Sequence, residues 1–114
     1  MEESRQAASK QPAVTIEQSV KKHKHRLMRQ RILEILKSEN PNAVDGKVIW
    51  FALDDLGMTA TEQEVGAELK YLEDRGYIRK AEVGGPSLGA LIYNITAEGI
   101  DLLDGILTNG GVAW

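Results

Sequence analysis

The chain has 114 residues, of which 42% are hydrophobic and 27% charged, and its formal net charge is −3. This length holds one domain rather than two, and the hydrophobic share is sufficient for a compact core. The chain contains no cysteine, which excludes disulfide bonds, thiol catalysis and thiolate zinc sites, and which fits a reducing cytosol.

Charge is strongly segregated along the chain. Residues 21–37 contain seven basic residues and one acidic residue, whereas residues 38–114 contain five basic and thirteen acidic residues. Such a distribution affects association with polyanions more than the net charge does. The basic segment is either a solvated helix start or a patch that faces phosphates or a partner, and we favour the patch.

Targeting and membrane signals are not evident in the sequence. No apolar run approaches the roughly 18 residues that a membrane span needs. The stretch Met1–Arg5 lacks the charged and then apolar layout of a signal peptide. We therefore expect a cytoplasmic protein without a membrane partner.

The first elements are a polar arm and a long helix. Residues 1–18 are rich in Glu, Gln, Ser, Ala and Lys, which predicts a disordered arm. A helix is expected from about Ser19 to Ser38. Lys21 and Lys24 occupy its inner stripe upstream, so the first turns should project into solvent. Farther along, the buried stripe is expected to contain Met28, Ile32, Ile35 and Leu36.

Two further helices are predicted in quick succession. The second covers residues 47–56, with Asp45 as its cap and Gly57 at its end. The third starts at Thr61, which forms an S/T-x-x-E capping box with Glu64. Two helices joined by so short a connection predict a helix-turn-helix. The inward stripe of the third helix consists of Val65, Leu69 and Leu72.

After Gly76 the hydrophobic period changes from 3.6 to 2. This predicts strands over residues 77–83 and 90–96, joined by a glycine-rich turn at 84–89. The turn lacks the patterns of a phosphate-binding loop and leads into a strand, so we interpret it as a hairpin tip. The predicted core contains Met28, Ile32, Ile35, Leu36, Ile49, Phe51, Leu53, Val65, Leu69, Leu72, Ile78, Tyr93, Ile95, Ile100 and Leu103.

A last helix should follow Thr96 as its cap. Its apolar residues spread over more than half of its circumference. A single core cannot cover so wide an apolar face of one helix. We therefore expect a homodimer whose interface is formed by the last helix, either alone or together with the first helix. Residues 109–114 are expected to form a flexible tail. The apolar residues of this helix are Ile100, Leu102, Leu103, Ile106 and Leu107.

The order helix, helix, turn, helix, two-stranded wing, helix is that of a winged helix. The segments Leu69–Ile78 and Tyr93–Gly99, with the glycine-bearing wing between them, resemble winged-helix regulators of the MarR and ArsR type. The basic leader, residues 21–31, and the Ile-Leu-x-x-Leu helix after it are similar to small winged-helix proteins of Mu-like prophages. The resemblance covers roughly residues 26–107. It implies that residues 19–108 form a mainly α winged helix-turn-helix domain (α-α-α-β-β-α) of a phage-type transcriptional regulator.

Double-stranded DNA is therefore the favoured partner. On the outward face of the third helix Gln63 could read an adenine, and Lys70 a guanine or a phosphate. Five carboxylates on that helix oppose insertion into a groove. Either the leader and wing hold the DNA, or the domain docks another protein instead. The expected DNA contacts are Lys21, Lys22, Lys24, Arg26, Arg29, Thr61, Gln63, Lys70, Arg79 and Lys80.

Catalysis is not indicated by any arrangement of residues. His23 and His25 would point about 200° apart on a helix, so they cannot share a metal there. Asp54 and Asp55 are adjacent on a helix and face different directions, so they do not form an acid and base pair. We expect a protein that is not an enzyme and that requires no metal or organic cofactor.

Overall fold

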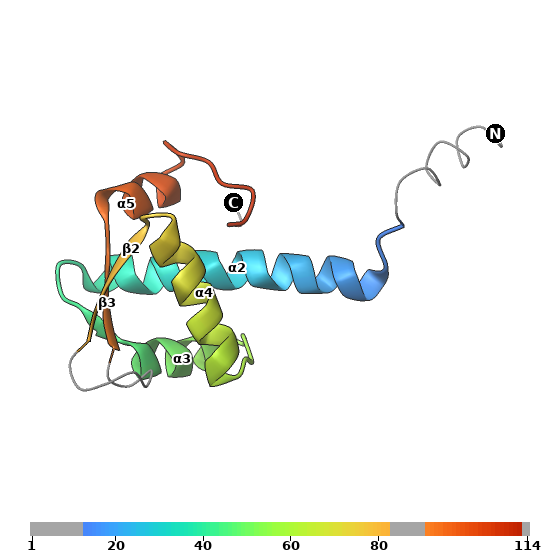
Figure 1. Ribbon diagram of the computed structural model, residues 1–114, viewed down its shortest axis with the longest axis horizontal. Helices are drawn as coiled ribbons and strands as arrows, with labels where there is room; N and C mark the ends of the chain where they lie inside the picture. Colours follow the sequence, from blue (N-terminus) through green and yellow to red (C-terminus); the bar gives the residue numbers. More distant parts are fainter. Residues whose placement is uncertain (1–12, 83–90, 113–114) are drawn as a thin grey trace.

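The structure is a computed structural model that describes residues 13–82 and 91–112. The expected arm up to residue 12, the hairpin tip and residues 113–114 lie outside the described residues. Figure 1 shows α2 as the central element, which α4 crosses while α3 and α5 lie on either side of it. The elements in chain order are α2 (Ile16–Glu39), β1 (Val44–Asp45), α3 (Gly46–Asp55), α4 (Glu62–Asp74), β2 (Ile78–Glu82), β3 (Leu91–Ile95) and α5 (Ala97–Leu103).

The helix α2 begins at Ile16, three residues before the expected start near Ser19. Thr15 and Gln18 form a capping box, in which the Gln18 amide donates to Thr15 Oγ1 and the Thr15 amide donates to Gln18 Oε1, both at 3.1 Å. This box stabilises the first turn without any apolar contact. As a result, part of the segment expected to be disordered is helical.

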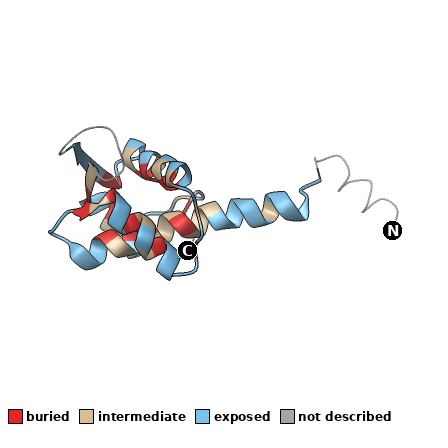
Figure 2. Cartoon of the chain, turned by 90° about the horizontal axis from the view of Figure 1, so that it is seen from below, coloured by how far each residue is buried: buried red, intermediate tan, exposed pale blue. Residues whose placement is uncertain are grey.

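The first half of α2 projects from the domain. No residue of the helix before Met28 is buried, and this projecting half, residues 16–27, is largely pale blue in Figure 2. From Met28 onward the helix packs against α3, α4, α5 and β3. The expectation that the first turns would extend into solvent is therefore confirmed.

A three-stranded antiparallel sheet has the strand order β1-β3-β2. The pair β2 and β3 forms the base of the expected hairpin, with Ile78 opposite Ile95. The short strand β1 was not expected. It pairs Val44 with Tyr93 and so joins the start of α3 to the sheet. Two residues are too few to show strand alternation in a sequence.

The core agrees with the prediction at most positions. Ile35, Ile100 and Leu103 are only half-buried, although they pack against the core. Phe51 is 58% exposed, so its assignment to the core was wrong. Ile49 and Leu53 occupy the inward face of α3, and the helical period turns Phe51 outward, where it stacks on Trp50. Buried residues that were not predicted include Leu33, Val44, Met58, Leu102 and Val112.

The helix α5 is shorter than expected. It ends at Leu103, and Gly105 closes it with a φ of 79°. Ile106 and Leu107 therefore lie beyond the helix. The prediction that one helix carries the whole wide apolar face was wrong. Within the helix, Leu102 is fully covered by the chain itself.

The chain after α5 returns to the domain. Val112 is only 2% exposed, and Asn109 hydrogen-bonds the hydroxyls of Tyr71 and Tyr77. A segment held in this way by burial and polar contacts differs from the flexible tail expected there.

Replacing Leu69 with alanine should lower the free energy of unfolding by roughly 2–5 kcal/mol, because it leaves a cavity in the core. Leu69 has 0% exposure and lies on the inward face of α4. Denaturant unfolding followed by circular dichroism measures the change. Ile106→Ala is the matched control, since Ile106 is 70% exposed, and it should change stability by less than about 0.5 kcal/mol. Equal stability of both variants and the wild type would contradict the observed packing of α4.

Candidate nucleic-acid interface

The outward face of α4 is a narrow polar strip. Gln63, Ala67, Lys70 and Asp74 are exposed and recur at helical spacing, while Val65, Leu69 and Leu72 face the core. Gln63 and Lys70 therefore both project to solvent from one face, as expected. Tyr71, the residue after Lys70, is half-buried.

Most carboxylates of α4 are engaged within the chain. Glu64 Oε1 accepts the Thr61 amide at 2.8 Å, and Thr61 Oγ1 accepts the Glu64 amide at 3.1 Å, which completes the expected capping box. The donation from the Thr61 amide lowers the pKa of the Glu64 carboxyl from its ordinary value. The other two surface contacts are Lys70 Nζ with Asp74 Oδ1 at 3.3 Å and Lys80 Nζ with Glu73 Oε1 at 3.6 Å.

The remaining engaged carboxylate, Glu68, is buried against α2. Arg29 Nε donates to Glu68 Oε1 at 2.5 Å, and His25 Nδ1 contacts Glu68 Oε2. The Glu68 side chain is only 4% exposed. The carboxylate repulsion that argued against groove binding is thus reduced, because the outward strip itself contains one cation and one acid.

Tyr71 links α4 to the end of the chain. The guanidinium groups of Arg29 and Arg75 each lie 3.6 Å from the centre of its ring. Its hydroxyl donates to Asn109 Oδ1 at 3.1 Å, and Arg29 Nη1 donates to the Gly111 carbonyl at 2.9 Å. A Cβ at Gly111 would lie 1.8 Å from the Tyr71 hydroxyl, so a side chain at this position would displace the contact. Arg29 therefore differs from Lys21, Lys22 and Lys24, because its guanidinium contacts the buried Glu68 carboxylate and the Gly111 carbonyl.

The lysines of the leader lie beside the start of α4. Lys21, Lys22 and Lys24 are all exposed on the projecting half of α2. A groove of about 450 Å³ separates this half from Glu64, in the first turn of α4. Lys21 and Lys24 both line the groove, so cations of the leader adjoin the helix end that carries Thr61 and Gln63.

The other basic side chains are distributed differently. Arg26 is half-buried, and its Nη1 lies 3.2 Å from His23 Nδ1. His23 and His25 thus have separate neighbours and do not converge. On β2, Arg79 and Lys80 are exposed at the base of the hairpin, where they pair with Asn94 and Tyr93 of β3. Within the described ranges, no three His, Asp or Glu side chains gather as a metal site would require.

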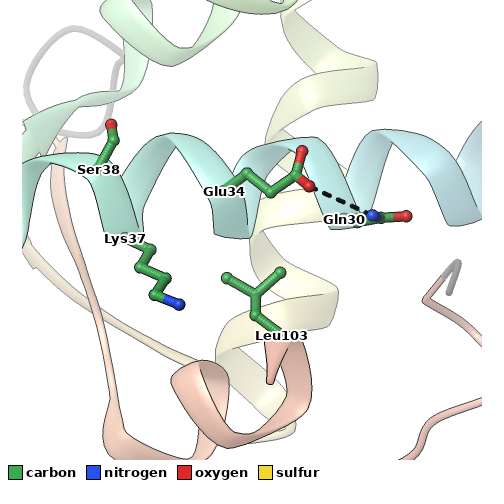
Figure 3. Close-up of a pocket in the computed structure, with 5 residues that line it drawn as sticks. All are labelled: Gln30, Glu34, Lys37, Ser38 and Leu103. Carbon is green, nitrogen blue, oxygen red and sulfur yellow. Dashed lines mark hydrogen bonds between the residues drawn. The ribbon is translucent and has the colours of Figure 1, made fainter. Parts of the chain in front are cut away.

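A second hollow of about 450 Å³ lies between α2 and α5. Gln30, Glu34, Lys37, Ser38 and Leu103 line it (Figure 3). Its polar groups contact one another or α5, through Gln30 with Glu34 at 3.3 Å and Lys37 with Asp104 at 2.9 Å. By helical period these α2 residues face away from the helix side that contacts α4. The hollow is therefore separate from the outward strip of α4.

Comparison with known proteins adds a structural relationship. No family model matches the sequence, and no curated protein matches it. Among solved structures, the chain is similar to the crystal structure of Bacillus subtilis PadR in complex with operator DNA, at 25% sequence identity and a TM-score of 0.54. The fold is a winged helix. The match covers 72% of this chain and 48% of the PadR chain, so the chain spans about half the length of that protein.

The winged-helix comparison gives the elements their usual roles. In that fold α3 and α4 take the positions of the helix-turn-helix, and β2 and β3 take the position of the wing. Among the described helices, none is both long enough and apolar enough to cross a membrane.

The contact between Arg29 and Glu68 was not predicted from the sequence. The signal that could have indicated it is a single acid, Glu68, beside a helix stripe otherwise filled by Val65, Leu69 and Leu72.

Replacing Arg29 with alanine should lower the free energy of unfolding by about 3 kcal/mol or more, because the buried Glu68 carboxylate loses its strongest partner. Thermal and denaturant unfolding measure this effect. Lys22→Ala removes an exposed cation of the same helix and should change stability by less than about 0.5 kcal/mol. If Arg29→Ala were as stable as Lys22→Ala, the Arg29 contacts would have no structural role.

Proposed function

We propose that the chain is a DNA-binding winged-helix protein that regulates transcription. The observation that carries this proposal is the outward strip of α4, where Gln63, Ala67 and Lys70 are exposed together while most of the neighbouring acids contact other groups of the chain. Such a strip can approach base edges in the major groove. The similarity to PadR, whose structure contains operator DNA, supports the same assignment.

The proposed contacts fall into two groups. Thr61, which caps α4, and Gln63 and Lys70 on its outward face would contact bases and the adjoining phosphates, with α4 as the recognition helix. The cations of the leader and of the wing would contact the phosphate backbone. Phosphate contacts supply most of the affinity, whereas base contacts supply sequence preference. The proposed phosphate contacts are Lys21, Lys22, Lys24, Arg26, Arg79 and Lys80.

Arg29 has a different proposed role. Because it contacts Glu68, Tyr71 and the Gly111 carbonyl, it would act as a positioning residue that sets the angle of α4 against α2. The finer assignment, a regulator of the kind found in Mu-like prophages, is supported only by the sequence motifs of the leader and of the helix that follows it. We also propose that two copies act together, since large apolar side chains stay exposed on the described surface.

A second candidate function is docking of another protein without DNA. The observation that favours it is the exposed apolar face of α3, where Val48 is 53% and Phe51 is 58% exposed. A titration on random duplex DNA at two salt concentrations separates the two functions, because only phosphate binding carries a strong salt dependence.

Binding to any duplex should weaken steeply with salt. If about five cations neutralise phosphates, the slope of log K against log salt is roughly −4 to −5, and a fourfold rise in salt weakens binding roughly 300- to 1,000-fold. Replacing Lys21, Lys22, Lys24 and Arg26 with alanine should flatten the slope by several units and weaken binding to all sequences alike. Fluorescence anisotropy with labelled duplexes measures both. An intact protein without salt-sensitive binding to any duplex would end the DNA proposal and leave protein docking.

The recognition helix should control preference between sequences. Gln63→Ala or Lys70→Ala should change the discrimination between a selected duplex and a random one by about 1–3 kcal/mol, with little change in the salt slope. Selection from a randomised duplex library, followed by competition titrations, provides the measurement. Glu82→Gln, at an exposed wing position, serves as a control that should leave the preference unchanged. Unaltered preference in both α4 variants would mean that α4 does not enter a groove.

A further inference from the structure

Large apolar side chains remain exposed in two separate places. On the projecting half of α2, Ile16 is 84% and Val20 is 61% exposed. On the outer face of α3, Val48 and Phe51 are each more than half exposed, as is Leu56 directly after the helix. By helical period Ile16 and Val20 lie within about 40° of each other, and Leu27 falls between them, so they form one stripe. Val48 and Phe51 likewise share one side of α3.

The two surfaces carry opposite charge. The projecting half of α2 contains Lys21, Lys22 and Lys24, and no acid follows Glu17 until Glu34. The α3 surface carries Asp54 and Asp55, both exposed. Within residues 13–82 and 91–112, none of these three lysines or two aspartates forms an ion pair.

A groove extends the acidic surface. It has a volume of about 550 Å³ and lies between α3 and the end of α2, and Val48 and Ala52 form its α3 side. Glu39 and Asp45 also line it, so the groove has the same acidic and apolar character as the outer face of α3.

These surfaces cannot meet within one chain. The projecting half belongs to a continuous helix, Ile16–Glu39, whose second half is fixed in the core, so it cannot fold back onto α3. Two projecting halves are poorly suited to pair through their stripes, because Lys24 flanks the stripe on each helix and like charges repel. The complementary surface available to the stripe is therefore α3 of a second copy.

We propose that the projecting half of α2 packs on the outer face of α3 in a second copy of this chain, and that the second copy returns the same contact. A reciprocal exchange closes under two-fold symmetry and leaves no free site for further association. Ile16 and Val20 then cover Val48 and Phe51, and Lys24, about 60° from the centre of the stripe, faces Asp54 and Asp55.

This arrangement deepens the two-copy assembly included in the proposed function and replaces α5 as its interface. Lys22 lies about 140° from the centre of the stripe, so it stays available to phosphates. Lys21 lies about 120° from the centre, at the other edge of the groove that Ile16 and Val20 also line. Lys24 is thereby assigned to the partner copy instead of to a phosphate. The same helix would thus bind a partner copy and DNA through different faces.

Cysteine crosslinking tests the contact directly, because the native chain has no cysteine. Val20→Cys and Phe51→Cys proteins are mixed without DNA and oxidised with copper phenanthroline, then separated by non-reducing electrophoresis. The mixture should yield a mixed dimer, whereas Val20→Cys alone should stay mostly monomeric on the gel. Val20→Cys mixed with Ile106→Cys is the control, because Ile106 is 70% exposed on another part of the surface. Equal crosslinking in the control, strong crosslinking of Val20→Cys alone, or none in the mixture would overturn the proposal.

Charge reversal tests the assigned ion pairs in the same way. Lys24→Glu should raise the dimer dissociation constant at least about tenfold, as should Asp54→Lys with Asp55→Lys, because each places like charges together. Mixing the two variants should restore a heterodimer, seen by sedimentation velocity. Lys22→Glu is the matched control and should leave the dissociation constant unchanged. A wild-type monomer at high micromolar concentration, or no rescue on mixing, would overturn the proposal.

The two proposals fail separately. Salt-sensitive DNA binding by a monomer would remove the exchanged contact and keep the DNA function. A crosslinked dimer that binds no duplex would keep the contact and remove the DNA function.

Discussion

The position of α4 depends on one buried contact, between the Glu68 carboxylate and the side chains of Arg29 and His25 on α2. A carboxylate that is almost fully removed from water is tolerable only when charged or donating partners replace its hydration. Apolar packing by Leu69 and Leu72 holds α4 against the core but tolerates small rotations, because it is non-directional. The hydrogen bond from Arg29 Nε is directional and therefore limits how far α4 can turn. The outward strip with Gln63 and Lys70 follows from that orientation.

The same arginine connects three parts of the chain. Its guanidinium lies on the ring of Tyr71 and donates to the Gly111 carbonyl, so the segment after α5 contacts α4 through two neighbouring groups. Val112 secures this segment in the core. Displacement of the segment would therefore expose one side of Tyr71 and remove one acceptor from Arg29. Residues 109–112 therefore help to hold α4 through Tyr71 and Arg29.

Local signals in the sequence were sufficient for most of the fold. The 3.6-residue period located α2, α3 and α4, and the change to alternation located the hairpin, because both patterns reflect which face is buried. What failed depended on contacts between elements. Phe51 has the composition of a core residue, yet the inward face of α3 was already filled by Ile49 and Leu53. The helical wheel for the last helix assumed that it continued past Leu103, where Gly105 ends it.

The candidate site could likewise be predicted only where it depends on local sequence and not on contacts between elements. Exposed cations such as Lys21 and Lys22 are recognisable from composition, because no neighbour alters their availability. The role of Arg29 could not be read from its spacing, since its partners Glu68 and Gly111 are 39 and 82 residues away. The acidity of α4, which argued against DNA as a partner, also had to be judged in three dimensions. Net charge counts every carboxylate equally, whereas a phosphate near the outward strip responds mainly to carboxylates without a nearby cation.

Charge segregation gives the projecting half of α2 two compatible uses. A basic helix that protrudes without apolar cover is expected to attract phosphates, but phosphate attraction does not explain Ile16 and Val20, whose exposure is unfavourable in water. An acidic and apolar partner surface explains both the exposed apolar side chains and the lysine beside them, since it covers the stripe and neutralises Lys24. The lysines on the remaining faces keep their charge for DNA. Under the proposed exchange, dimer formation would also hold two recognition helices at a fixed separation, which is the geometric requirement for reading two half-sites of one duplex.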